Sequence, residues 1–170
     1  MKSNYLPSIS REAIATVEGD SNALFDLLVE PLHEELYRRQ DFSFMDELTE
    51  GQQLFLAYDY LRAQVLQGGF LQFLVNGYVG LLPEMPGWLT KVQAQEMAEV
   101  IDDVLKVFVL NIELLDKETT TQEFAGLYEE LKEFQILDDR FTSLHDETMN
   151  RLAMYAKDHL NEFATVVDAS

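Results

Sequence analysis

Hydrophobic residues recur with helical spacing along nearly the whole chain. After a start signal at Asp20 and Ser21, a leucine stands at every fourth position, at Leu24, Leu28, Leu32 and Leu36. Pro31 falls inside this segment and predicts a kink or a split, because proline removes a backbone hydrogen bond. The pattern predicts a helix, or two short ones, in this region.

The middle of the chain predicts two further helices. Thr49 and Gln52 form a capping box. The helix after it has an apolar face and is stopped by two glycines: Leu54, Tyr58, Leu61 and Val65, then Gly68 and Gly69. A long helix is expected over residues 92–116, with a core stripe of Met97, Val100, Ile101, Val104, Leu105 and Phe108. Its second half is apolar almost all round, so we expect it to lie centrally.

The last third of the chain is also helical in pattern. Thr120 and Glu123 form a second capping box, followed by Phe124, Leu127, Leu131 and Phe134. Ser143 is expected to cap a final helix whose inner face is Met149, Leu152, Ala153, Ala156, Leu160 and Phe163. No segment alternates with period two, so strands are not predicted.

The expected fold is one compact all-α domain over residues 1–170. Residues 1–19 are expected to form a loosely ordered N-terminal arm. Glycine and proline cluster only between residues 77 and 87, so residues 77–90 are expected to form a surface loop.

Composition narrows the function classes. The 170 residues are 47% hydrophobic, which excludes a disordered acidic tail. Lysine and arginine number 12 against 31 acidic residues, so the formal charge of −19 repels phosphate and argues against direct nucleic-acid binding. There is no cysteine, signal peptide or apolar run of membrane-spanning length, so we expect a soluble, cytoplasmic protein.

Motifs for catalysis or cofactors are absent. The glycines form no phosphate-binding loop, and no Gly-x-Ser-x-Gly elbow exists. Glu30 and His33 form a single Glu-x-x-His, whereas helical di-iron sites need this motif twice. Thr142 and Ala156 stand at the corresponding positions before His145 and His159. We therefore expect no metal, no cofactor and no catalytic residue.

The most distinctive segment is residues 67–77, Gln-Gly-Gly-Phe-Leu-Gln-Phe-Leu-Val-Asn-Gly. Two glycines permit a tight backbone reversal before a short helix. Phe70, Phe73 and Leu74 are expected to point into the core, while Gln72 and Asn76 share the other face. We favour a helical corner whose side-chain amides bind loose backbone groups. A ligand pocket floored by the two amides is the alternative.

This segment resembles the Gly-Gly-Phe-x-Gln-Phe-x-x-Asn signature of a bacterial domain-of-unknown-function family known through an acidic DNA-mimic protein. The signature residues here are Gly68, Gly69, Phe70, Gln72, Phe73 and Asn76. The Leu-Asp-Asp-Arg-Phe stretch at 137–141 extends the resemblance to about residues 52–163. The resemblance implies a compact all-α fold. For the mimic branch it implies a negative surface that occupies the DNA-binding face of a transcription regulator.

The magnitude of the charge permits mimicry. A domain of this length is roughly 40 Å across, and duplex DNA of that length carries ~24 phosphate charges. Residues 96–147 hold 15 acids against four bases. The expected partner-binding surface consists of Glu96, Glu99, Asp102, Asp103, Glu129, Glu130, Glu133, Asp138 and Asp139. Their helical spacing approaches that of phosphates on one strand, and Asp138 and Asp139 are expected to continue the row across a turn. A solvated face that only keeps the protein soluble is the simpler alternative.

The leading hypothesis is thus a non-catalytic DNA mimic that binds a basic DNA-binding protein. A homodimer is compatible with it, because pairing would lengthen the acidic surface. An immunity or antitoxin protein that inhibits a basic toxin is the first alternative. It would need an apolar anchor, for which Pro83, Pro86 and Trp88 are candidates. An enzyme or small-molecule binder using Gln72 and Asn76 is the second.

Overall fold

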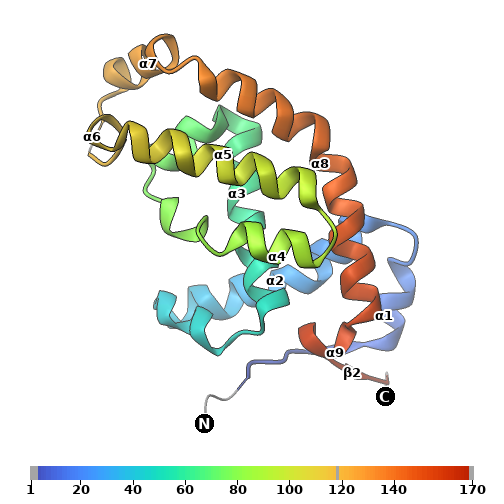
Figure 1. Cartoon of the computed structure of the whole chain (residues 1–170). Coiled ribbons are helices and arrows are strands. Elements are labelled where there is room, and N and C mark those ends of the chain that lie inside the picture. The colour runs from blue at the N-terminus through green and yellow to red at the C-terminus, as the bar shows by residue number, and fades with distance from the viewer. Residues whose placement is uncertain (1–3, 118, 169–170) are drawn as a thin grey trace. The chain divides into compact units, whose positions relative to one another are not determined.

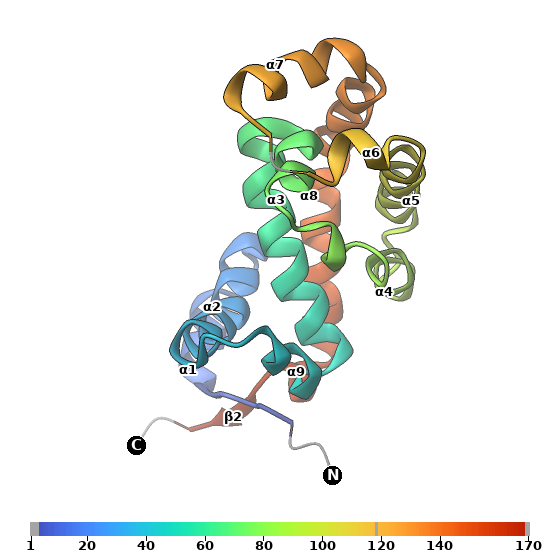
Figure 2. The same ribbon diagram turned by 90° about the vertical axis from the view of Figure 1, so that its left-hand side faces the viewer.

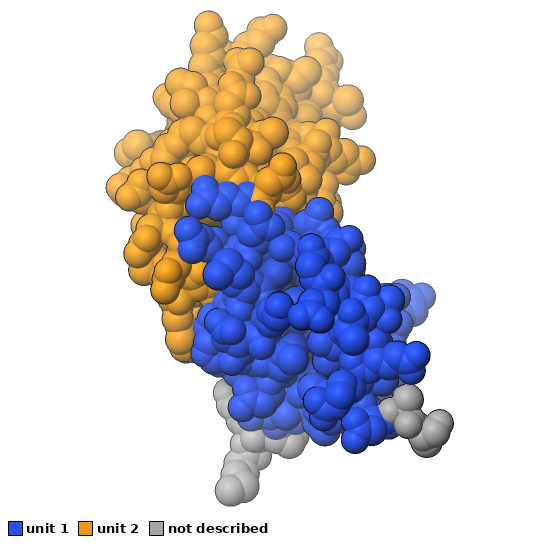
Figure 3. Space-filling model, turned by 90° about the vertical axis from the view of Figure 1, so that its right-hand side faces the viewer, with its two compact units in different colours: residues 1–56, 147–170 blue, residues 57–146 orange. Residues whose placement is uncertain are grey.

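The structure, a computed structural model, describes residues 4–117 and 119–168. It is all-α apart from one short two-stranded ladder, as the sequence predicts (Figure 1). The chain divides into two compact units, residues 1–56 with 147–170 and residues 57–146 (Figure 3). We call them unit 1 and unit 2. Whether the chain is a single domain stays a prediction.

Unit 1 contains the helix that the leucine spacing predicts. Helix α2 (Ser21–Arg39) begins after Asp20, whose side chain accepts the Ala23 N–H at 3.0 Å. It passes through Pro31 without being split. Its buried stripe is Leu24, Phe25, Leu28, Val29, Leu32 and Leu36. Burial of this stripe outweighs the one backbone hydrogen bond that proline removes.

The other elements of unit 1 are short or shared with unit 2. They are α1 (Arg11–Thr16), the 3-10 helix η1 (Phe42–Glu47), the start of α3 (Glu50–Val75), the end of α8 (Glu133–Asp158) and α9 (Leu160–Phe163). Phe55 packs between Phe25 and Phe163, with ring centroids 4.6 and 4.5 Å away. These rings form the centre of the unit 1 core.

Two expectations about the chain ends are wrong. Strand β1 (Ser8–Ser10) pairs in parallel with β2 (Thr165–Val167), although no strands were predicted. Three residues are too few to show alternation, and the pairing joins opposite ends of the chain. The expected loose arm over residues 1–19 instead forms β1 and α1, and Ile9 is buried. The first three residues of that arm lie outside the described residues.

Gln52 connects three segments of unit 1. The capping box forms as predicted, since the Thr49 N–H donates to Gln52 Oε1 at 3.0 Å and the Gln52 N–H to Thr49 Oγ1 at 3.2 Å. The side-chain amide of Gln52 also donates to the carbonyls of Tyr5 (2.8 Å) and Phe163 (3.2 Å). Gln52 is fully buried, so these bonds replace the water it has lost.

Unit 2 contains the rest of α3 and α8 and the elements between them. These are η2 (Val79–Leu81), α4 (Met85–Lys91), α5 (Gln95–Leu110), α6 (Ile112–Leu115) and α7 (Thr121–Glu130). Helices α4 and α5 lie side by side in both views (Figures 1 and 2). No single helix in the described ranges is long and apolar enough to cross a membrane. Helix α3 and the segment Val79–Lys91, which are bent relative to each other, reach the required length and apolar composition only when taken together.

Much of the expected surface loop at residues 77–90 is helical. It contains η2 and most of α4, and it buries Leu82, Met85 and Leu89. Pro86 occupies the first turn of α4, where proline costs no hydrogen bond. The glycines and prolines therefore mark the ends of short helices within this segment.

The long helix expected over residues 92–116 is shorter and is interrupted. Gln93 adopts a φ of 66°, so α5 starts only at Gln95, and non-helical backbone at Asn111 separates α5 from α6. Its apolar second half is not central. Val109 is 65% exposed and Leu110 is 82% exposed.

The final third of the chain shows one correct and one wrong helix start. Thr120 caps α7 by accepting the Glu123 N–H at 3.2 Å, as predicted. Ser143 is not a cap, because α8 already begins at Glu133 and the Ser143 hydroxyl donates to the Arg140 carbonyl within the helix. Such a bond along a helix gives serine a partner without ending the helix.

Replacing Gln52 by leucine should lower the free energy of unfolding by ~2–4 kcal/mol, because a buried N–H and two carbonyls lose their partner. Gln53→Leu is the matched control, since among the described residues the Gln53 side chain makes one bond, to the Leu48 carbonyl. It should cost about 1 kcal/mol or less. Urea denaturation followed by circular dichroism measures both, and equal losses would show that Gln52 does not connect these segments.

Candidate acidic interface

The glycine pair of the signature forms a sharp corner inside α3. Gly69 adopts φ 81° and ψ 177°, a conformation that interrupts the helix as predicted. A Cβ atom on Gly69 would lie 2.3 Å from Asp138 Oδ2 and 2.4 Å from Tyr128 Oη. Position 69 therefore requires glycine both for its backbone angle and for the close approach of two side chains.

Asp138 caps the helical turn that follows this corner. The Phe70 N–H, the first of the new turn, donates to Asp138 Oδ1 at 2.8 Å. The Tyr128 hydroxyl donates to the Gly68 carbonyl, just before the break. The corner thus binds α8 through Asp138 and α7 through Tyr128. The two segments that carry the family resemblance, 68–76 and 137–141, meet here.

Burial makes Asp138 an unusual carboxyl group. Its pKa is raised to about 6, chiefly by desolvation, with the Phe70 N–H acting in the opposite direction and the Asp139 charge adding to the rise. Burial, and then the charge of Asp138, raises the pKa of Tyr128 to about 12. Asp138 was expected to continue the partner-binding acidic row across a turn, but it is half-buried within α8 and its carboxyl group accepts an internal bond, so it is not part of an exposed row.

The aromatic residues of the signature lie in the core as predicted. Phe70 and Phe73 are fully buried, and Phe70 meets Phe141 edge-on with centroids 5.6 Å apart. The Tyr58 hydroxyl is 2.9 Å from His145 Nδ1, and burial lowers the pKa of this histidine. These contacts pack α3 against α8 within unit 2.

The amides of the signature were expected to bind backbone groups. Among the described residues they instead bond to other side chains. Gln64 Oε1 accepts from Gln72 Nε2 at 3.1 Å and from Asn76 Nδ2 at 2.7 Å, and Gln67 Oε1 accepts from Gln72 at 3.0 Å. The four side-chain amides thus form one hydrogen-bonded group beside the corner. Residues four apart on a helix lie on one face, so Gln72 and Asn76 can both donate to Gln64.

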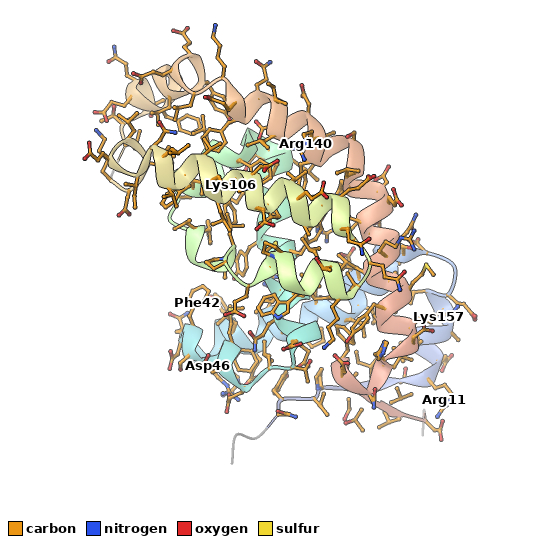
Figure 4. All side chains as sticks on the ribbon, in the orientation of Figure 1. Arg11, Phe42, Asp46, Lys106, Arg140 and Lys157 are labelled. Carbon is orange, nitrogen blue, oxygen red and sulfur yellow. The ribbon has the colours of Figure 1, made fainter. Side chains whose placement is uncertain are left out.

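Helix α5 presents three unpaired carboxylates. Glu96, Glu99 and Asp102 are exposed and make no ion pair in the described part of the chain. Asp103 differs, because it accepts from Arg140 at 2.8 Å and lies 3.8 Å from Lys106. Figure 4 labels these two basic residues, on α8 and α5. It contributes little free negative charge.

The acids of α7 and α8 do not form one helical row. Glu129 and Glu130 end α7, whereas Glu133 begins α8. Asp139 lies inside α8 and not beyond a turn, and all four side chains are exposed. Seven of the nine expected acids thus remain exposed without an ion pair to described residues: Glu96, Glu99, Asp102, Glu129, Glu130, Glu133 and Asp139. We call these seven the acidic surface.

Total charge does not distinguish the two units. Unit 1 holds 15 acids and 6 bases, a net charge of −9, and unit 2 holds 16 acids and 6 bases, a net charge of −10. What distinguishes the acidic surface is its placement on three helices of one unit. In unit 1, by contrast, Arg38 and Arg39 bind Glu35, and Arg39 also binds Glu47.

The other candidate sites, an apolar anchor at Trp88 and a metal site at the histidines, receive little support. Trp88, expected as an exposed anchor, is half-buried on α4. Within the ranges 4–117 and 119–168, no three histidine or acidic residues are grouped to hold a metal ion. His159 is exposed and its Nδ1 lies 2.9 Å from the Tyr155 carbonyl.

The fold and site together define an acidic, all-α protein that is built around a capped Gly-Gly corner and presents unpaired carboxylates on three helices. A family model described as DMP19-like protein matches residues 46–159, which is most of the chain and contains the corner and the whole acidic surface. The chain belongs to the DMP19-like family. The match confirms at family level the resemblance seen in the sequence, with limits near the expected 52–163. No curated protein matches the chain.

Gly69→Ala should destabilise the protein by more than ~1 kcal/mol, because alanine is strained at positive φ and its Cβ would displace Asp138 and Tyr128. Gly80→Ala is the control, since a Cβ there meets nothing within 4 Å. That change should stay within about 0.5 kcal/mol. Thermal unfolding measures the stability of both variants. A Gly69→Ala protein as stable as the wild type would contradict the corner geometry.

Asp138 should make the stability depend on pH. In the folded protein the Asp138 carboxyl group keeps its proton up to about pH 6, because its pKa is raised to about 6. In the unfolded chain it releases the proton near its ordinary pKa of 3.8. The folded state therefore binds more protons in this interval, and stability falls as pH rises through it. Asp138→Asn keeps an acceptor for Phe70 and should flatten the fall of stability, measured by urea denaturation, across the pH interval from about 3.8 to about 6. An exposed carboxyl group of the same unit that is not among the groups shifting the pKa of Asp138 provides the control, as Asp102→Asn should retain the wild-type slope.

Proposed function

We propose that this protein is a DNA mimic, a non-catalytic binding protein whose acidic surface occupies the DNA-binding face of a basic DNA-binding protein. The observation that carries the proposal is the DMP19-like match, since this is a family of DNA-mimic proteins and the match includes α5, α7 and α8. The seven exposed carboxylates supply the negative charge that such a role requires.

The spacing of these charges supports the proposal. Glu96, Glu99 and Asp102 follow one another at intervals of three on α5, and such neighbours lie ~5–6 Å apart. A protein that binds DNA through lysine and arginine would meet a comparable row of negative groups, and its counterions would be released as they are on DNA. Complex formation should therefore be strongly salt-dependent.

A toxin inhibitor remains the alternative, but its expected anchor receives less support. Trp88 is half-buried, and its helix turns Met85 and Leu89 into the core. The half-buried position of Trp88 beside the buried Met85 and Leu89 favours a packing role for this helix over a role as the centre of an interface.

The test is capture from lysate of the source organism on immobilised protein, with elution by a salt gradient or by duplex DNA and identification by mass spectrometry. DNA-binding proteins should leave at moderate salt and be displaced by duplex DNA. The triple variant Glu96→Lys, Glu99→Lys, Asp102→Lys should lose them while its helical circular dichroism stays unchanged.

The matched control reverses three exposed acids of unit 1, Glu30→Lys, Glu34→Lys and Asp158→Lys. Each reversal adds two charges, so both triple variants carry −13 instead of −19. The control should bind nearly as the wild type does. Equal losses in the two variants would mean that only total charge matters. Retention in the α5 variant, or a partner that DNA cannot displace, would refute mimicry through this surface.

A further inference from the structure

Unit 2 also exposes four large apolar side chains near the acidic surface. Leu110 is 82% exposed, Val109 65%, Ile136 64% and Ile112 45%. We call these four side chains the apolar patch. All belong to unit 2, at the end of α5, in α6 and in the first turns of α8. Large apolar side chains that lie near one another on a surface usually mark an interaction site.

An ion pair places Leu110 and Ile136 on neighbouring parts of the surface. Arg140 on α8 binds Asp103 on α5, and the two helices run in opposite directions (Figures 1 and 4). Leu110 lies two turns after Asp103 on the same face of α5, and Ile136 lies one turn before Arg140 on the same face of α8. Both residues are thus displaced from the ion pair in the same direction.

Unpaired acids of the acidic surface flank the patch along each helix. Val109 lies two turns after Asp102 on one face of α5, and Ile136 lies between Glu133 and Asp139 on α8. An apolar centre with a charged rim is the arrangement found in protein–protein interfaces. The edges of duplex DNA present no such group of aliphatic side chains.

We infer that the apolar patch anchors the DNA-binding protein of the proposed function, on which this inference rests, by entering an apolar depression within its basic face. Charge complementarity selects this occupant, because the acids around the patch attract a basic rim. A second copy would bring Asp102, Glu133 and Asp139 against like charges. The patch gives the complex a component of affinity that salt does not screen.

The experiment uses the DNA-binding protein that duplex DNA displaces in the capture described above, purified and titrated calorimetrically at three NaCl concentrations. The double variant Leu110→Ser, Ile136→Ser should bind ~10-fold or more weakly at every salt concentration, with the salt slope of the wild type. Leu66→Ser is the control. Leu66 is 52% exposed on α3 of the same unit, and its replacement should change affinity less than twofold.

Each other outcome overturns the inference in a distinguishable way. If the double variant binds as the wild type does while the α5 charge reversal still weakens binding, the apolar patch is no anchor and the proposed function stands. If no DNA-displaceable protein is captured, both fail. If sedimentation equilibrium shows a wild-type dimer that the double variant loses, the occupant is a second copy.

Discussion

The bond between the Asp138 carboxylate and the Phe70 N–H is the interaction on which unit 2 most depends. Gly69 breaks α3 and exposes the first amide of a new turn, and Asp138 supplies the acceptor from a residue 68 positions later. Tyr128 closes the other side of the corner. The glycine is needed because any side chain would occupy the space that these two groups fill. Through this corner, α7 and α8 acquire fixed positions against α3.

That constraint determines which acids are available to a partner. Asp138 is committed to the corner and Asp103 to Arg140, so neither can act as a free negative charge. The seven carboxylates of the acidic surface are exposed and lack basic neighbours in ion-pair distance among the described residues. A surface of this kind attracts basic proteins over distances of about a Debye length and accelerates their association.

Units 1 and 2 carry nearly equal net charge. Charge alone would therefore let either unit bind many basic surfaces, without selecting one partner or one binding face. Selectivity requires contacts that depend on shape. The apolar patch beside Asp102, Glu133 and Asp139 supplies such contacts in our proposal, and its aliphatic side chains have no counterpart on DNA. Electrostatic attraction would then govern the association rate, and the apolar contacts would govern the lifetime of the complex.

The sequence by itself determined the all-α class, the capping box at Thr49, the helix cap at Thr120, the break at the two glycines and the burial of Phe70 and Phe73, because these follow from local spacing and backbone preference. It also carried the resemblance to the family. Only the tertiary structure decided the role of Asp138, the pairing of Asp103 with Arg140, the strand ladder and the exposure of Leu110. Each of these depends on which distant segment lies opposite. A pattern of residue types records how each helix is built, but not what packs against it.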